Sequence, residues 1–329
     1  MTGGGARFDV LGIGNAIVDT LAGADEEFLK QRGLRKGAMN LADAATSDAL
    51  AALVKPLREC SGGSVANTIA ALASFGSRCA YIGKVRDDRL GAVFRDDMRA
   101  LGVTFDTPPS PAAAAAATAR CIVLVTPDAR RTLQTYLGAC VELSADDVDE
   151  STVRDSRVVY LEGYLWDPPA ARQAFVKTAA IAHAAGREVA LTLSDPFCVD
   201  RHRESFRDLV ENHIDILFAN ELEVVSLYQS ANFTEAMQTV RGKVKVAALT
   251  RSAKGSVVLS GGESHSVDAC PVDRVVDDTG AGDAYAAGFL HAFNRGQPLA
   301  ACARLGGIAA AEVISHYGAR PEVSLAELA

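Results

Sequence analysis

The chain has 329 residues, of which 49% are apolar and 22% charged, and its 33 Lys and Arg against 41 Asp and Glu give a net charge of −8. This balance excludes a disordered protein and argues against general binding to nucleic acids or to membrane surfaces. The length fits one large α/β domain with an added segment, so we expect a single domain over residues 1–329.

The chain carries no recognisable membrane or export signal. No stretch reaches the roughly 18 to 20 uninterrupted apolar residues of a membrane span, because Arg304 and Glu312 break the apolar segment near the carboxyl end. The amino end lacks a small-residue cleavage pattern, so we expect a cytoplasmic protein. Seven cysteines without a C-x-x-C pair predict free thiols.

Short β-rich runs alternate with longer segments of helical period, which predicts a parallel sheet with helices on both faces. The predicted strands cover residues 8–13, 78–82, 157–161, 188–193, 214–218 and 244–249. The predicted helices each end before a glycine and cover residues 65–75, 89–101 and 170–185.

Two segments, 16–45 and 105–137, do not fit this alternation. They contain short strand-like pieces, among them 119–125, between Pro and Gly turns. We expect these segments to pair into a small β-sheet that forms a lid. The edge of such a sheet can stay free in a monomer or pair across a homodimer, so both states stay open.

The glycine-rich sequence DDTGAGDAYAAGF at 277–289 carries the strongest chemical signal. Apolar residues at helical spacing after Asp283 place this turn at the start of a helix. Converging backbone N–H groups and the helix dipole there predict a site for phosphate oxygens. The same helix end should hold the Asp283 carboxylate ionised, with a low pKa, so that it can accept a hydroxyl proton. The alternative is that Asp283 only caps its helix.

Residues 278–283, DTGAGD, resemble the carboxyl-terminal signature of the ribokinase-like (PfkB) family of carbohydrate and nucleoside kinases. Residues 62–67, GGSVAN, resemble its amino-terminal signature, and the likeness extends from Asp9 to about Pro321. The resemblance implies a Rossmann-like, three-layer α/β/α domain with a β-sheet lid, transferring the ATP γ-phosphate to an alcohol. It implies Asp283 as the catalytic base, with an anion hole built from the amides of Gly280, Ala281 and Gly282.

Two other nucleotide-binding motifs match less well. Gly12-Ile13-Gly14 resembles the start of a dinucleotide fingerprint, but Ile17 stands where the third glycine is required. The Walker A pattern is not met, because Val85 follows Gly83-Lys84 and Arg78 occupies the place of the first glycine.

The resemblance also places acceptor-binding residues in the amino-terminal part of the chain. It puts Asn15, Asp19 and Asn67 at the sugar, with Gly62 and Gly63 allowing the backbone to approach. Asn15 and Asp19 stand four residues apart, about 13 Å along a strand, so the chain must bend between them to grip one ribose. The alternative for Asn67 is an exposed polar helix face.

On the nucleotide side, Asn220 and Glu223 resemble the family's Asn-x-x-Glu element, which organises Mg²⁺ and phosphates largely through water. Glu223 alone could equally be a solvated helix carboxylate. Residues 250–255, TRSAKG, resemble the next nucleotide loop, although Ser252 stands where relatives commonly carry glycine. In that loop the resemblance assigns ATP contacts to Thr250, Arg251 and Gly255. Mg²⁺ with ATP is therefore the expected cofactor, and K⁺ is an activator in parts of the family.

Several stretches resemble the adenosine kinase branch of the family, namely 9–16, 162–164 and 316–321. Arg131 corresponds to a lid arginine that approaches the phosphates in that branch, with neighbouring Arg130 as the alternative register. Tyr164 or Leu165 could lie against a purine or belong to the core.

The sequence therefore leads to a hypothesis about the reaction. It is an ATP-dependent kinase for the 5′-hydroxyl of a ribonucleoside, most readily adenosine, which fits purine salvage. The alternatives are a sugar kinase of the same family, acting on ribose or fructose, and a binding protein that has lost phosphoryl transfer.

Overall fold

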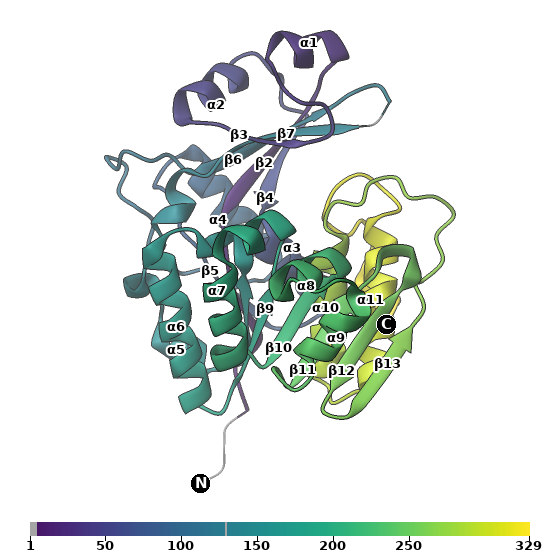
Figure 1. The fold of residues 1–329 in the computed structure, drawn as a ribbon. Helices are drawn as coiled ribbons and strands as arrows, with labels where there is room; N and C mark the ends of the chain where they lie inside the picture. Colours follow the sequence, from purple (N-terminus) through teal and green to yellow (C-terminus); the bar gives the residue numbers. More distant parts are fainter. Residues whose placement is uncertain (1–4, 129) are drawn as a thin grey trace.

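The computed structural model describes residues 5–128 and 130–329, and its centre is an eight-stranded sheet with the order β13-β12-β11-β10-β9-β8-β1-β5 (Figure 1). The strands from β5 to β11 in this order run parallel, and β12 and β13 continue antiparallel. The bounds are β1 Phe8–Ile13, β5 Cys79–Ile82, β8 Ser156–Glu162, β9 Glu188–Thr192, β10 Ile216–Asn220, β11 Val246–Thr250, β12 Ser256–Ser260 and β13 Glu263–Val267.

Helices cover both faces of this sheet, as predicted, because successive strand side chains point to opposite faces. In β1, for example, Leu11 belongs to one hydrophobic core and Val10 to the other. The first core is closed by α5 Glu150–Arg154, α6 Pro169–Ala184, α7 Pro196–His213, α8 Glu221–Tyr228 and α9 Phe233–Val240. The second is closed by α3 Ser64–Ser74, α4 Arg89–Ala100, α10 Ala281–Phe293 and α11 Leu299–Val313.

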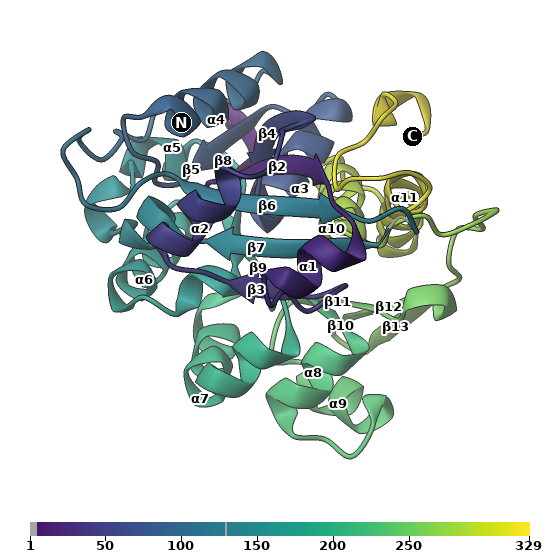
Figure 2. The ribbon, with the colours of Figure 1, turned by 90° about the horizontal axis from the view of Figure 1, so that it is seen from above.

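A second, five-stranded sheet lies above the first and has the order β3-β7-β6-β2-β4 (Figure 1). Its strands are β2 Ile17–Gly23, β3 Met39–Leu41, β4 Arg58–Gly62, β6 Ala119–Val125 and β7 Arg131–Tyr136. Helices α1 Glu26–Gln31 and α2 Ala44–Ala51 cover its outer face (Figure 2). We call this sheet with its two helices the lid. Its strand β4 lies beyond residue 45, where the first predicted segment ends.

The observed elements follow the sequence pattern closely where apolar residues are continuous. Strand β6 has the predicted bounds, whereas β10 and β11 each begin two residues later than expected. The seven cysteines are all unpaired. In the part of the chain that the structure describes, no helix is both long and apolar enough to cross a bilayer.

Candidate active site

Asp283 lies in the first turn of α10, as the glycine-rich motif predicts. Gly280 precedes this helix with a φ of 81°, and a Cβ there would lie 2.6 Å from that of Ala319, so the turn requires glycine. Ser64 Oγ donates to Asp283 Oδ1 (2.6 Å), and Asn67 Nδ2 donates to Oδ2 (3.2 Å). Asp283 is therefore held by two donors from α3, which lies far from it in sequence.

The expectation of a low pKa for Asp283 was wrong. Burial raises the pKa of this carboxyl from 3.8 to about 6, against the opposing effect of its hydrogen bonds to Ser64 and Asn67. Desolvation thus raises the pKa of Asp283 by more than the helix end lowers it. Asp283 is still ionised about ten to one at pH 7, and its pKa is closer to the value that suits a proton acceptor at neutral pH.

The backbone amides before Asp283 are not equivalent. The Ala281 N–H donates to the carbonyl oxygen of Asp278 (3.2 Å). The Gly280 and Gly282 amides have no hydrogen-bond partner among residues 5–128 and 130–329. Of the three amides of the predicted anion site, those of Gly280 and Gly282 are thus free, among the described residues, to donate to a ligand.

The side chain of Asn67 lies between Asp283 and Arg320. It is 7% exposed, and its amide bridges Asp283 to Arg320, whose Nε donates to Asn67 Oδ1 (3.0 Å). Both polar ends of the Asn67 side chain are therefore engaged by protein groups. Asn67 is therefore not part of an exposed helix face, and its contact with the acceptor diol stays a prediction.

The lid and the larger domain meet at Asn15, between β1 and β2, where the chain passes from one sheet to the other as the predicted bend requires. Asp19, in β2, faces the larger domain. A Cβ on Gly62 would lie 2.4 Å from the Asp19 carboxyl group, so glycine leaves the room that this side chain occupies. Burial raises the pKa of Asp19 to about 6. Asn15 Oδ1 is buried and has no partner among the described residues.

Sequence reasoning gave no role to Glu162, the last residue of β8, which is 1% exposed. Its Oε1 accepts from Asn15 Nδ2 (2.6 Å), and its Oε2 accepts from the backbone N–H of Val65 (3.0 Å). One carboxyl group thereby joins the lid junction to the start of α3. The available signal was its position at the carboxyl end of a buried parallel strand, where α/β sheets bind ligands.

The inner face of the lid is largely apolar. Strand pairing places Asp19 beside Cys121, Cys121 beside Thr135 and Thr135 beside Leu41, so these side chains share a face. The residues Ala22, Ile122 and Leu124 point the other way, toward α1 and α2. We call the apolar side chains of the inner face the lid floor; they are Leu21, Met39, Leu41, Val123 and Leu133.

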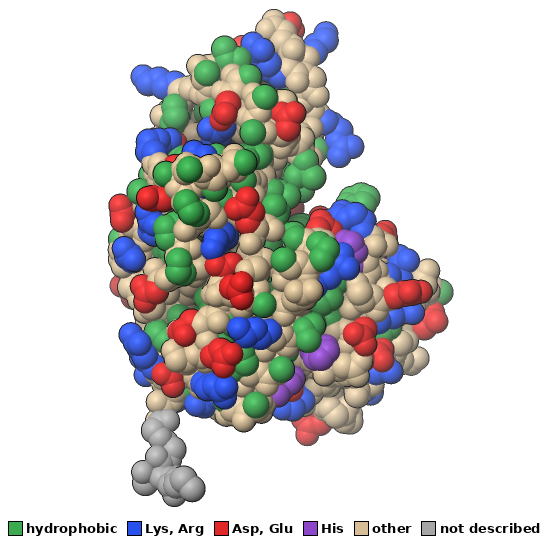
Figure 3. Space-filling view, turned by 90° about the vertical axis from the view of Figure 1, so that its left-hand side faces the viewer, with side chains coloured by type: hydrophobic (Ala, Val, Ile, Leu, Met, Phe, Trp, Pro, Cys, Tyr) green, Lys and Arg blue, Asp and Glu red, His purple; other side chains and the backbone are tan. Residues whose placement is uncertain are grey.

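The lid floor is open to a ligand at one end. Leu41 is 67% exposed and Met39 50% exposed, whereas Val123 is 5% exposed. The space-filling view shows the molecule hollowed between the lid, at the top, and the larger domain (Figure 3). Exposed apolar side chains beside a polar group such as Asp19 are typical of a ligand site.

Arg131, on the same face of the lid, reaches the glycine-rich motif. Its Nη1 lies 2.9 Å from Asp277 Oδ2, with both side chains about one-tenth exposed, and its guanidinium lies over the Tyr317 ring at 5.7 Å. Arg130 is exposed and lies near Gly37, within the lid. The structure therefore directs Arg131, rather than Arg130, toward the site.

The two residues of the Asn-x-x-Glu element bind each other. Asn220 caps α8 by accepting from the Glu223 N–H (2.9 Å), and Glu223 Oε1 accepts from Asn220 Nδ2 (2.6 Å). Glu223 is 5% exposed, so it is not a solvated helix carboxylate, and burial raises its pKa to about 7. The pair lies at the end of β10, at the same edge of the sheet as Glu162.

The loop after β11 contains Ser252, at the position where relatives commonly carry glycine. Ser252 adopts a φ of 50°, in the left-handed region that glycine occupies without cost. The Arg251 N–H donates to the Gly255 carbonyl (2.7 Å) and closes the loop, which begins at Thr250. The Arg251 guanidinium lies 4.4 Å from the Phe233 ring centroid.

Tyr164 and Leu165 differ in how deeply their side chains are buried. Leu165 is fully buried in the core, whereas Tyr164 is partly exposed beyond β8. The Tyr164 hydroxyl donates to Asp195 Oδ2 (3.3 Å). Tyr164 also packs against the first core, and its contact with a purine stays a prediction.

The family of the chain follows from comparison with known proteins. A family model described as pfkB family carbohydrate kinase matches residues 38–325. The chain belongs to the pfkB family. It is a phosphotransferase that acts on an alcohol group, within the nucleoside and sugar kinases of that family.

Two solved structures resemble this pfkB kinase along almost its whole length. An adenosine kinase from Sinorhizobium meliloti is 49% identical, and a probable sugar kinase from Rhizobium etli CFN 42 is 47% identical. Each match covers 98% of both chains with a TM-score of 0.90. The adenosine kinase of Schizosaccharomyces pombe is 23% identical over 92% of each chain. The expected three-layer fold with a lid is confirmed.

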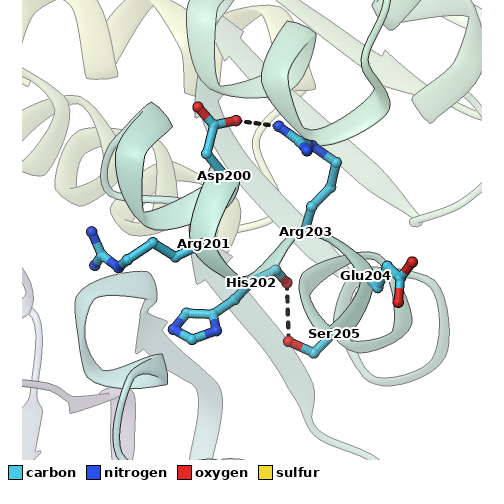
Figure 4. Close-up of a pocket in the computed structure, with 6 residues that line it drawn as sticks. All are labelled: Asp200, Arg201, His202, Arg203, Glu204 and Ser205. Atoms are coloured by element: carbon cyan, nitrogen blue, oxygen red, sulfur yellow. Dashed lines mark hydrogen bonds and ion pairs between the residues drawn. The ribbon is translucent and has the colours of Figure 1, made fainter.

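One surface pocket of this pfkB kinase lies away from Asp283. It is lined by residues 200–205 of α7, where His202 departs from helical geometry with a φ of −131° (Figure 4). Arg203 pairs with Asp200, and Ser205 Oγ donates to the His202 carbonyl (3.0 Å). The pocket contains none of the predicted site residues, and the Arg201 and His202 side chains bind Asp167 outside it.

The buried carboxyls predict how stability depends on pH. Burial raises the pKa of Asp19 and Asp283 to about 6, and that of Glu162 and Glu223 to about 7. Between about pH 5 and 7 these four groups therefore bind more protons in the folded chain than in the unfolded chain, so their contribution to stability falls as the pH rises. Carboxyls with a lowered pKa, such as Asp128 and Asp215, act in the opposite direction below about pH 5. His291, whose pKa burial lowers to about 4, acts in the opposite direction below pH 6.5. We expect a higher Tm at pH 5.5 than at pH 7.5.

Differential scanning calorimetry at the two pH values measures this difference. In Glu162→Gln the difference should shrink, because one of the four groups no longer titrates. Glu204→Gln, at an exposed position of α7, should leave it unchanged. A Tm that rises from pH 5.5 to 7.5 in the unaltered chain would contradict the prediction.

Proposed function

We propose that the protein transfers the γ-phosphoryl group of MgATP to the 5′-hydroxyl of a ribonucleoside, most readily adenosine. The observation that carries this choice is the lid floor beside Asp19. A ribose needs polar partners around its hydroxyls, whereas a purine presents flat apolar faces that suit exposed aliphatic side chains. The adenosine kinase from Sinorhizobium meliloti, 49% identical, supports the same choice.

In this proposal the acceptor lies between Asp19 and Asp283. The ionised Asp19 carboxylate accepts from two neighbouring ribose hydroxyls, and the unpartnered Asn15 Oδ1 can accept from a third donor. The base extends along the lid floor toward Leu41. The 5′-hydroxyl then lies at Asp283, which Ser64 and Asn67 hold in place.

Phosphoryl transfer follows by in-line attack. The 5′-oxygen forms a bond to the γ-phosphorus, the bond from that phosphorus to the β–γ bridging oxygen breaks, and ADP leaves. Asp283 accepts the hydroxyl proton, while the Gly280 and Gly282 amides donate to the γ-phosphoryl oxygens. Arg131 can leave its ion pair with Asp277 and bind a phosphate oxygen instead. Asn220 and Glu223 would hold the Mg²⁺ of the MgATP substrate through water, and the ion would neutralise phosphate charge.

A panel of nucleosides and sugars, with ADP release as the readout, tests the proposed function. We expect adenosine to give the highest kcat/KM, with ribose and fructose far below it. A sugar that exceeds every nucleoside would assign the sugar kinase alternative. Binding of adenosine without ADP release for any acceptor would indicate a protein that has lost transfer.

A substitution in the lid floor separates the two acceptor classes further. Leu41→Gln should raise the KM for adenosine by about tenfold, because it removes apolar contact with the base. The KM for any sugar accepted should change little. Leu57→Gln is the matched control, since Leu57 is 70% exposed and lies outside the lid floor. Equal effects of Leu41→Gln on both acceptor classes would contradict the assignment of the base.

A further inference from the structure

Arg320 follows α11 in the carboxyl-terminal segment and extends its side chain between the lid and the larger domain. Its Nε donates to Asn67 Oδ1 (3.0 Å). Its Nη2 donates to the carbonyl oxygen of Ser61 (2.7 Å) and to the Ser61 hydroxyl (3.0 Å). One planar guanidinium thus joins strand β4 of the lid to helix α3.

These contacts determine which end of the Asn67 amide meets Asp283. An amide presents either an oxygen or an NH₂ group to its neighbour, and the partners decide between them. Because the Arg320 N–H groups can only donate, Asn67 Oδ1 must face Arg320. Asn67 Nδ2 then points to Asp283 Oδ2 at 3.2 Å. Without Arg320, Asn67 Oδ1 loses its donor, and only the hydrogen bond to Asp283 still fixes the position of the amide.

Arg320 also brings a positive charge to this region. Its three acceptors are an amide, a carbonyl and a hydroxyl, so its hydrogen bonds leave the charge unneutralised. Burial raises the pKa of Asp19 and Asp283 to about 6, and the Arg320 charge limits that rise in both. The same guanidinium therefore acts on a lid carboxyl and on the proposed base.

We propose that Arg320 is a positioning residue of the active site, which orients the Asn67 amide toward Asp283 and supplies the positive charge that faces Asp283 and Asp19. This inference rests on the proposed function, in which Asp283 is the base. Arg320 acts through Asn67 and through its charge. It is distinct from the arginine of the lid, Arg131, which faces Asp277.

The pH dependence of the reaction depends on every charged or titratable group near this pair. The titratable groups that interact with the charge of Asp283 or Arg320 are Asp19, Cys60, Tyr81, Asp97, Tyr160, Glu162, Tyr164 and Glu223. Arg131 faces Asp19 in addition. Arg320 is the cation that acts on both Asp19 and Asp283 from outside the lid sheet.

The test compares pH profiles of kcat/KM for adenosine in Arg320→Gln and in the unaltered chain. Loss of the charge should move the acid limb upward by about one pH unit, since an opposite charge nearby lowers a carboxyl pKa by about that much. At pH 7 kcat/KM should fall by about fourfold, because Asp19 and Asp283 would each be about half protonated. Arg304→Gln, on the exposed side of α11, is the matched control and should leave the limb in place.

Arg320→Lys separates charge from geometry and serves if Arg320→Gln fails to fold. It should keep the acid limb near its original pH but lower kcat, because an ammonium cannot reproduce the forked contacts to Asn67 and Ser61. An unmoved limb in folded Arg320→Gln, or unchanged kcat in Arg320→Lys, would overturn this inference alone. An unaltered chain that phosphorylates nothing would instead overturn the proposed function, and this inference with it.

Discussion

Asp283→Asn is expected to lower kcat by at least about a hundredfold, with only a modest change in the KM for the nucleoside. The substituted amide keeps the size of the side chain but cannot accept the hydroxyl proton. The amide oxygen can still accept from Asn67 Nδ2, and the NH₂ group can donate to the Ser64 hydroxyl, so the contacts that hold the side chain can be kept. Steady-state ADP release, measured at saturating ATP, gives both parameters.

Asp273→Asn is the matched control for this substitution, because Asp273 is an exposed carboxylate in the segment that precedes the same motif. It should retain full turnover. Near-normal kcat in a folded Asp283→Asn protein would remove Asp283 from the chemical step and leave it as a helix residue held by Ser64. A drop in Tm that accounts for all the lost activity would also argue against the role.

Asp19→Asn should affect binding more than chemistry. We expect the KM for adenosine to rise by about a hundredfold while kcat changes less, because hydrogen bonds to an ionised group contribute about 1.5–3 kcal/mol each. The carboxyl lies against Gly62, in a space that a Cβ would fill, so its position is well determined. Initial rates over a range of adenosine concentrations measure this effect.

The acceptor itself supplies a second check on Asp19. A 2′,3′-dideoxynucleoside should be a poor substrate of the unaltered chain, and Asp19→Asn should no longer distinguish it from adenosine. Glu27→Gln, at an exposed carboxylate of helix α1, should keep the original discrimination. Full discrimination in Asp19→Asn would mean that other groups bind the diol.

The sequence predicted the elements whose hydrophobic pattern is local and strong. Strand β6 is apolar except for Arg120, and its bounds were predicted correctly. Strand β4 was not predicted, because its sequence RECSG shows no apolar alternation and its place depends on pairing with β2. Tertiary pairing decides the structure of such a segment, and no local pattern carries that information.

The residues of the candidate site likewise fall into two groups: those that belong to a local motif and those that only the fold brings together. Asp283 and the glycines around it form a contiguous motif, so the sequence pointed to them directly. Glu162 and Arg320 act through contacts that span 97 to 259 positions along the chain, and only the folded arrangement brings their partners together. The pKa of Asp283 was misjudged for a related reason, because desolvation depends on packing that a local motif does not describe.

The buried carboxyls described above also bear on how the phosphate donor enters. Glu162 and Glu223 both lie close enough to Asp283 for each carboxyl to feel its negative charge. A bare polyanion would meet electrostatic repulsion from this cluster before it reached the two free amides of the glycine-rich turn. In the proposed reaction, a donor whose phosphates are already partly neutralised by a divalent counter-ion meets much less of this repulsion.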